Sequence, residues 1–206
     1  MPPRLTVGAV LFDGFELLDA FGPLGILGIL RDRLRILTLA EHVSPVASSA
    51  GPRIAIDRAF ETSGPIDILL VPGGPGTRRE IHNTLLIAWL QRAAAFTPHV
   101  ATVCTGSALL ARTGLLDGRR ATTNKRAFHW VASQGPHVVW QPEARWVEDG
   151  KFFTASGVAA GIDMSLGLVA TLFGRETAIS VATRAEHDWH EDKSWDPFAR
   201  INGLVA

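Results

Sequence analysis

The sequence contains a single cysteine, Cys104, at the point where a predicted strand is followed by a predicted helix. Residues 99–103 form an apolar run, and the residues from Thr105 onward have the apolar spacing of a helix. A thiol at such a turn lies near backbone N–H groups and the positive end of the helix dipole, which stabilise a thiolate. Position alone leaves two interpretations open: a reactive nucleophile raised over the sheet by a tight turn, or a small buried hydrophobic residue.

A glycine-rich loop, residues 72–76, follows the apolar run at 66–71. The loop does not fit the dinucleotide fingerprint, because Arg79 stands where the third glycine should be, and it lacks the lysine of a phosphate-binding loop. A tight turn between strand and helix would explain the glycines by itself. If Cys104 is a nucleophile, we favour a loop whose backbone N–H groups complete an oxyanion hole with the N–H of Thr105.

Asp19 is a carboxylate in an apolar helical segment, between Leu18 and Ala20. Burying it without a partner would be costly, so one interpretation is an exposed position on the helix. The other is that Asp19 faces the same edge of the sheet as Cys104. Desolvation would then raise its pKa and make it a proton donor or acceptor beside the sulfur.

The histidines offer weaker alternatives. His187 and His190 lie among acidic residues, but no third ligand stands at a recognised metal-binding spacing, so we expect no metal site. His129 has the chemistry of a base for Cys104, but the sequence does not place it within reach of the thiol. Three aromatic side chains near the C-terminus are expected to cover a groove or an interface: Trp189, Trp195 and Phe198.

Buried strands alternate with helices along most of the chain. Strands are predicted at 5–12, 34–39, 66–71 and 99–103, with a hairpin within 45–59. The main helices are predicted at 15–30, with a kink or restart at Gly22-Pro23, and at 77–96, where Thr77 and Glu80 form a capping box. Shorter strands and helices follow, then a long helix over 159–173 and the start of another over 176–187.

This alternation predicts an α/β fold with a mostly parallel sheet between two helix layers. Ligands in such folds collect at the carboxyl ends of the strands. Asp19, the glycine loop and Cys104 would then share one edge of the sheet.

The composition favours one globular domain over residues 1–206, with a core at about 5–190 and a tail at 191–206. Hydrophobic residues make up 47% of the chain and charged residues 19%, and 20 basic side chains balance 20 acidic ones. We therefore expect no nucleic-acid partner and no membrane association. One cysteine and the absence of a signal-peptide pattern are typical of a cytoplasmic protein.

Four segments in consistent order resemble the DJ-1/PfpI superfamily, nearest its isocyanide hydratase-like branch: ELLDAFGP, ILLVPGGPGTR, VCTGSALLARTGLLDGRRATTN and TASGVAAGIDMSLGLV. The resemblance implies a flavodoxin-like three-layer sandwich, a homodimer and no cofactor. It implies that Cys104 is a nucleophile at a strained strand–helix elbow and that the Asp19 carboxylate is hydrogen-bonded to its sulfur. The backbone of Gly74 and Thr105 would supply hydrogen-bond donors.

The resemblance also implies a reaction, in which a Cys104 thiolate attacks the terminal carbon of an isocyanide. Asp19 supplies a proton, and water releases an N-substituted formamide. Alternatives are a glyoxalase- or deglycase-type enzyme, or a non-catalytic redox or ligand sensor based on Cys104.

Two departures from the family pattern matter. Thr105 stands where peptidase-like members have histidine, which argues against proteolysis. Asn124 stands where many relatives have a histidine, so we expect a different pocket wall around Gly73, Thr123 and Asn124, and a substrate that differs accordingly.

Overall fold

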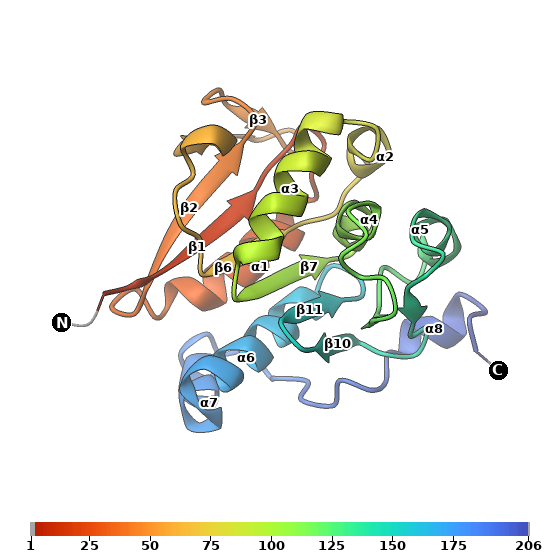
Figure 1. Cartoon of the computed structure of the whole chain (residues 1–206). Helices are drawn as coiled ribbons and strands as arrows, with labels where there is room; N and C mark the ends of the chain where they lie inside the picture. The colour runs from red at the N-terminus through yellow and green to blue at the C-terminus, as the bar shows by residue number, and fades with distance from the viewer. Residues whose placement is uncertain (1–2, 206) are drawn as a thin grey trace.

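The computed structural model describes residues 3–205 and places a seven-stranded sheet at the centre of the molecule (Figure 1). The strands are β1 Leu5–Val10, β2 Leu34–Ala40, β5 Arg58–Ala59, β6 Ile68–Val71, β7 His99–Val103, β10 Trp146–Asp149 and β11 Phe152–Ala155. Their order is β10-β11-β7-β6-β1-β2-β5, and every neighbouring pair is parallel except β10 with β11.

Helices cover both faces of this sheet. One layer contains α1 Leu17–Gly28, α6 Ala160–Phe173 and α7 Arg175–Arg184, and the other contains α3 Thr84–Phe96, α4 Gly106–Arg112 and α5 Phe128–Gln134. Side chains alternate between the two layers along each strand. In β6, Leu69 and Val71 join one core, and Ile68 and Leu70 join the other. The predicted three-layer α/β fold is confirmed.

Several short elements lie outside the seven-stranded sheet. Within residues 3–205, two strand pairs lie outside the main sheet: β3 Val46–Ala47 with β4 Arg53–Ile54, and β8 Arg120–Ala121 with β9 Val139–Trp140. The remaining elements are the 3-10 turn η1 Phe60–Thr62 and the short helices α2 Thr77–Glu80 and α8 Pro197–Ile201. The pair β3–β4 is antiparallel, which confirms the predicted hairpin.

The predicted helix over 77–96 is two helices, and the predicted capping box is wrong. The Asn83 side chain accepts hydrogen bonds from two backbone N–H groups of the first turn of α3, so a new helix begins there. The Thr77 hydroxyl donates to the Gly74 carbonyl at 2.7 Å, and the Glu80 carboxylate accepts from Arg79 and Asn83. A side-chain cap inside the segment therefore outweighs its continuous apolar pattern.

Helix α1 continues through Pro23 as one helix, so of the predicted kink or restart at Gly22-Pro23 the restart does not occur. The helix begins at Leu17, which puts Asp19 in its first turn, beside the carboxyl ends of the central strands. Among the helices within residues 3–205, none combines the length and apolar character needed to cross a membrane.

Candidate active site

Cys104 lies at a strained elbow directly after β7. Its φ is 57°, in the left-handed region that costs energy for a residue with a side chain. Its N–H donates to the carbonyls of Ala155 at 3.1 Å and Ser156 at 2.8 Å. Its carbonyl accepts from the hydroxyls of Thr123 at 2.8 Å and Ser107 at 3.0 Å. These bonds fix the backbone on both sides, so the strained conformation persists and the side chain has a defined direction.

Asp19 is fully buried and lies next to the Cys104 thiol. Its Oδ2 accepts a hydrogen bond from the N–H of Gly73 at 3.1 Å. Its Oδ1 has no hydrogen-bond partner among residues 3–205, and the Cys104 thiol is the group beside the carboxyl that lowers its pKa. The structure therefore brings the nucleophile and the carboxyl group predicted from the sequence into one site.

Burial changes the acidity of both groups. It raises the pKa of Asp19 to about 7, although the Gly73 N–H and the thiol, which hydrogen-bond to the carboxylate, oppose this change. Burial also raises the pKa of Cys104, and the charge of Asp19 raises it further. The Thr105 N–H and the Asn124 side chain oppose that rise.

The prediction that Cys104 is unusually acidic is therefore wrong. Beside an ionised Asp19, the pKa of the Cys104 thiol is raised, not lowered. Cys104 is only 7% exposed, and desolvation outweighs the donors around the sulfur. Because each group changes the acidity of the other, the two titrate as a coupled pair that shares a proton.

Asn124 is a donor to the sulfur as well as part of a pocket wall. Its Oδ1 accepts the N–H of Ala127 at 3.0 Å, which fixes the orientation of the amide. Its NH2 group lies toward Cys104, where it lowers the pKa of the thiol. The residue that departs from the family pattern thus acts directly on the candidate nucleophile.

The glycine loop packs against the elbow and positions it. A Cβ at Gly73 would lie 2.5 Å from the Thr105 nitrogen and 3.0 Å from Asp19 Oδ2, so only glycine allows this approach. The Gly74 N–H donates to the Thr105 hydroxyl at 3.0 Å, and the Thr77 hydroxyl oxygen lies 3.0 Å from the same oxygen. Of the two predicted backbone donors, the Thr105 N–H contacts the sulfur, and the Gly74 N–H is already occupied.

The histidines lie outside this arrangement. His129 is exposed on α5, where its ring meets the Phe128 ring edge-on. The His187 Nε2 lies 2.9 Å from Oδ1 of Asp163, and the backbone N–H of His190 donates to the same oxygen. Within the described part of the chain, no three histidine, cysteine or acidic side chains are grouped to hold a metal ion.

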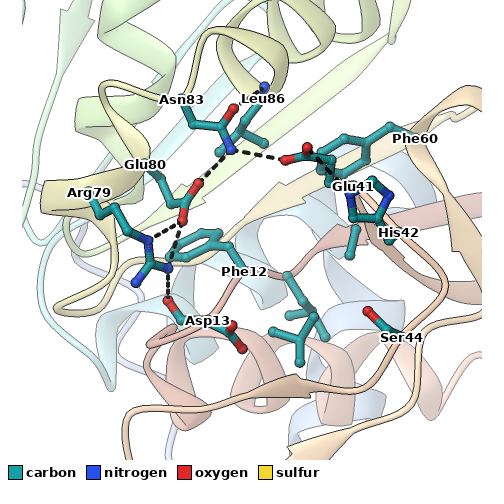
Figure 2. A pocket seen from close by; sticks show the side chains of 13 residues that line it. Phe12, Asp13, Glu41, His42, Ser44, Phe60, Arg79, Glu80, Asn83 and Leu86 are labelled. Atoms are coloured by element: carbon teal, nitrogen blue, oxygen red, sulfur yellow. Dashed lines mark hydrogen bonds and ion pairs between the residues drawn. The ribbon is translucent and has the colours of Figure 1, made fainter.

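Figure 2 shows a pocket of about 270 Å³ at the carboxyl ends of β1 and β2. Its acidic groups have partners: Asn83 donates to Glu41 at 3.0 Å and to Glu80 at 2.9 Å, and Arg79 also donates to Glu80. None of the site residues predicted from the sequence lines it. A second pocket, of about 390 Å³, is lined by Asn124 but not by Cys104, so the Asn124 side chain lies between this pocket and the thiol.

Phe198 lines the second pocket, as predicted for an aromatic side chain that covers a groove, but the buried anchor of this C-terminal segment, Asp196, was not predicted. Asp196 is 1% exposed, and its carboxylate accepts hydrogen bonds from the Ser156 hydroxyl and the Phe198 N–H. Ser156 is the residue whose carbonyl holds the Cys104 N–H, so this segment reaches the elbow. The Asp196-Pro197 pair is a signal for a helix start and was the one indication of α8 in the sequence.

Lys125 is a second buried group that the sequence analysis did not single out. Its Nζ donates to the Thr122 hydroxyl at 2.8 Å and to the Ala144 carbonyl. Burial lowers its pKa to about 8, and the negative charge of Asp196 opposes this change. The lysine therefore holds the 122–125 loop in place from inside the protein.

The chain is similar in sequence to known proteins over most of its length. The chain is 34% identical to an isonitrile hydratase of Pseudomonas putida over 183 residues, which cover 89% of this chain and 78% of that protein. It is 30% identical to the HTH-type transcriptional regulator GbdR of Pseudomonas aeruginosa, over 86% of this chain but only 49% of the regulator.

Solved structures have the same fold. A ThiJ/PfpI family protein from Pseudomonas syringae matches with a TM-score of 0.84 and 29% identity, over 90% of this chain and 76% of that one. A DJ-1 superfamily protein from Salmonella typhimurium, solved as a cysteine-to-alanine mutant, matches with a TM-score of 0.78 and 26% identity, over 90% and 100%. The sequence pattern of the DJ-1/PfpI family matches residues 6–171. This chain belongs to the DJ-1/PfpI family.

Proposed function

We propose that this protein is an enzyme that hydrates isocyanides to N-substituted formamides, with Cys104 as nucleophile and Asp19 as acid and base. The observation that carries the proposal is the contact between a buried thiol and a buried carboxyl group whose pKa is raised to about 7. A carboxyl group with that pKa can accept and return a proton at neutral pH. The 34% identity to an isonitrile hydratase supports the same reaction.

The first step forms a covalent intermediate. The Cys104 sulfur attacks the terminal isocyanide carbon and forms the S–C bond. The thiol proton passes to Asp19 and from there to the same carbon, which forms a C–H bond. The C≡N bond becomes C=N, and the product of this step is a thioimidate.

Water completes the reaction. It adds to the thioimidate carbon, its protons reach the nitrogen and the sulfur by way of Asp19, and the C–S bond breaks. The N-substituted formamide leaves and the thiol is restored, so the sum is isocyanide plus water. The Thr105 N–H and the Asn124 amide stabilise the sulfur while it carries negative charge.

The direct test is turnover of cyclohexyl isocyanide by the purified protein, with N-cyclohexylformamide measured by mass spectrometry. In D2O the formyl carbon should carry deuterium, because the proton on that carbon comes from the exchangeable thiol–carboxyl pair. Cys104→Ala should have no activity. A Cys104→Ala variant as fast as the wild type would remove the covalent mechanism.

The same panel separates the two alternative functions. Turnover of methylglyoxal without turnover of any isocyanide would favour glyoxalase-type chemistry. A stable two-oxygen adduct on Cys104 after mild peroxide, with no turnover of any compound, would favour a sensor.

The proposal includes an assembly and a compartment. We propose a homodimer, because α1 exposes the apolar side chains of Leu18 and Phe21 on its outer face. Light scattering at micromolar concentration measures the mass directly, and a monomer would contradict this part. The reaction needs a reduced thiol, which the cytoplasm maintains.

A further inference from the structure

The pocket beside the thiol has the size of a small-molecule site. Its volume is about 390 Å³, within the range of roughly 300–1,000 Å³ that is usual for ligand pockets, and its walls are predominantly apolar. The walls come from the loop 124–126, the turn 157–160 and the C-terminal segment with α8. Phe198, which is 54% exposed, supplies the aromatic wall on the α8 side.

One side chain, that of Asn124, contacts both this pocket and the Cys104 sulfur. Asn124 lines the pocket and donates to the Cys104 thiol. Gly157 lies on the other side of the amide, where a Cβ would be 3.4 Å from Asn124 Nδ2. Gly157 directly follows Ser156, whose carbonyl holds the Cys104 N–H. Cys104 itself does not line the pocket: Asn124 lies between the sulfur and the apolar walls, so a substituent carried on an atom at the sulfur would have to reach past this amide.

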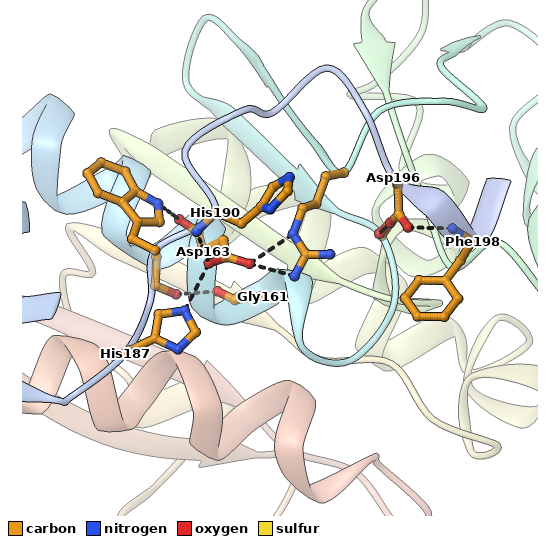
Figure 3. Close-up of polar contacts among 10 residues, drawn as sticks. Gly161, Asp163, His187, His190, Asp196 and Phe198 are labelled. Atoms are coloured by element: carbon orange, nitrogen blue, oxygen red, sulfur yellow. Dashed lines mark hydrogen bonds and ion pairs between the residues drawn. The ribbon is translucent and has the colours of Figure 1, made fainter.

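The C-terminal segment that forms one wall of the pocket is fixed to the rest of the fold by hydrogen bonds. Figure 3 shows the two anchors, Asp163 and Asp196. The buried Asp163 carboxylate accepts from the Arg145 guanidinium at 2.8 and 2.6 Å, and it also contacts His187. Asp196 binds Ser156 through its side chain and begins α8 by capping the N–H of Phe198. Phe198 is thus held at a fixed distance from the turn that supports Cys104.

The charges around the pocket indicate a neutral occupant. Arg145 is paired with Asp163, and the Lys125 ammonium donates to two buried oxygens. Each Asp196 carboxylate oxygen accepts one hydrogen bond, from the Ser156 hydroxyl and the Phe198 N–H, and the Arg126 side chain is exposed at the rim. A neutral apolar group gains from these walls without displacing any ion pair.

We propose that this pocket receives the apolar N-substituent of the substrate and that Phe198 is the residue that determines which substituents fit. The proposal rests on the proposed isocyanide hydration, since the terminal carbon must be at Cys104 while the substituent occupies the pocket. Cyclic aliphatic or aryl isocyanides are then the preferred substrates, and methyl isocyanide is a poor one.

The experiment compares cyclohexyl and methyl isocyanide as substrates of the wild type, Phe198→Ala and Phe96→Ala. Phe96 is 89% exposed at the end of α3 and does not line this pocket, so its variant makes the same chemical change elsewhere. The wild type should prefer the cyclohexyl compound in kcat/KM by at least about tenfold. Phe198→Ala should reduce that preference roughly five- to tenfold, with turnover of methyl isocyanide retained.

A second measurement separates failure of the pocket from failure of the reaction. Binding of N-cyclohexylformamide and N-methylformamide, measured by calorimetry, needs no turnover. Tighter binding of the cyclohexyl compound that Phe198→Ala weakens and Phe96→Ala preserves would support the pocket even if no isocyanide reacts, and the hydratase proposal alone would fall. Equal binding of both compounds, or a preference that Phe198→Ala leaves intact, would overturn the pocket assignment.

Discussion

Replacing Asp19 by asparagine should make the protein more stable and nearly inactive. Burial raises the pKa of this carboxyl from 3.8 to about 7. At about 1.36 kcal/mol for each pKa unit, an ionised Asp19 destabilises the folded state by about 4 kcal/mol. Asparagine has nearly the same shape, keeps an acceptor for the Gly73 N–H and carries no charge.

The destabilisation of the folded state by Asp19 increases as the pH rises. Below pH 3.8 the carboxyl is protonated in both the folded and the unfolded chain, so the penalty is absent. As the pH rises, the unfolded chain loses this proton first, and the penalty grows until the folded state also ionises near pH 7. Of the total, about 2–3 kcal/mol develops between pH 5 and pH 8.

Urea unfolding of the wild type and Asp19→Asn at pH 5 and pH 8 measures this difference. The stability advantage of the variant should increase by about 2–3 kcal/mol between the two pH values. Asp32→Asn, at an exposed aspartate, is the control and should show no such increase. An advantage for Asp19→Asn that stays constant or shrinks toward pH 8 would refute the argument that burial controls this carboxyl.

The activity of Asp19→Asn should fall, although the stability of this variant rises. Loss of a general acid and base lowers kcat by roughly 100- to 10,000-fold. The thiol itself should become more acidic in Asp19→Asn, because the neighbouring negative charge that raises its pKa is gone. Alkylation of Cys104 by iodoacetamide as a function of pH should therefore shift to lower pH, in a variant that no longer turns over substrate.

Three further substitutions test other parts of the site. Asn124→Leu removes a donor to the sulfur, so the thiolate fraction at pH 8, followed by alkylation rate, should fall at least about tenfold; an unchanged rate would exclude this contact. Gly73→Ala places a methyl group 2.5 Å from the elbow backbone and should destabilise by about 1–3 kcal/mol in urea, whereas Gly25→Ala, which has open space, should not. Asp163→Asn leaves the Arg145 guanidinium without its counter-charge and should cost roughly 3 kcal/mol, and a loss below about 1 kcal/mol would contradict a structural role for this pair.

The architecture could be predicted from the sequence because it depends on short-range patterns. Apolar runs such as Ile68–Val71 and His99–Val103 indicate buried strands whatever surrounds them. The order of Asp19, the glycine loop and Cys104 along the chain then places all three at one edge of a parallel sheet. The break at Asn83 was hidden, since the apolar positions on either side of it continue the same helical pattern.

The chemistry of the site could not be predicted in the same way, because it depends on distances across the fold. The acidity of Cys104 follows from how completely Asp19 is buried beside it, which no local pattern reports. The role of Asp196 follows from its contact with Ser156, 40 positions earlier in the chain. Both results combine residues from three or more separate segments.

Helix α8 has a consequence for how members of this family diverge. The family pattern ends at residue 171, but Asp196, Phe198 and Asn202 form one wall of the pocket beside the thiol. Mutations in this short C-terminal segment can therefore alter the range of substrates while the nucleophile, its carboxyl partner and the sheet stay unchanged. In this chain, the segment beyond the family match is therefore the part through which the substrate range could change without any change at Cys104 or Asp19.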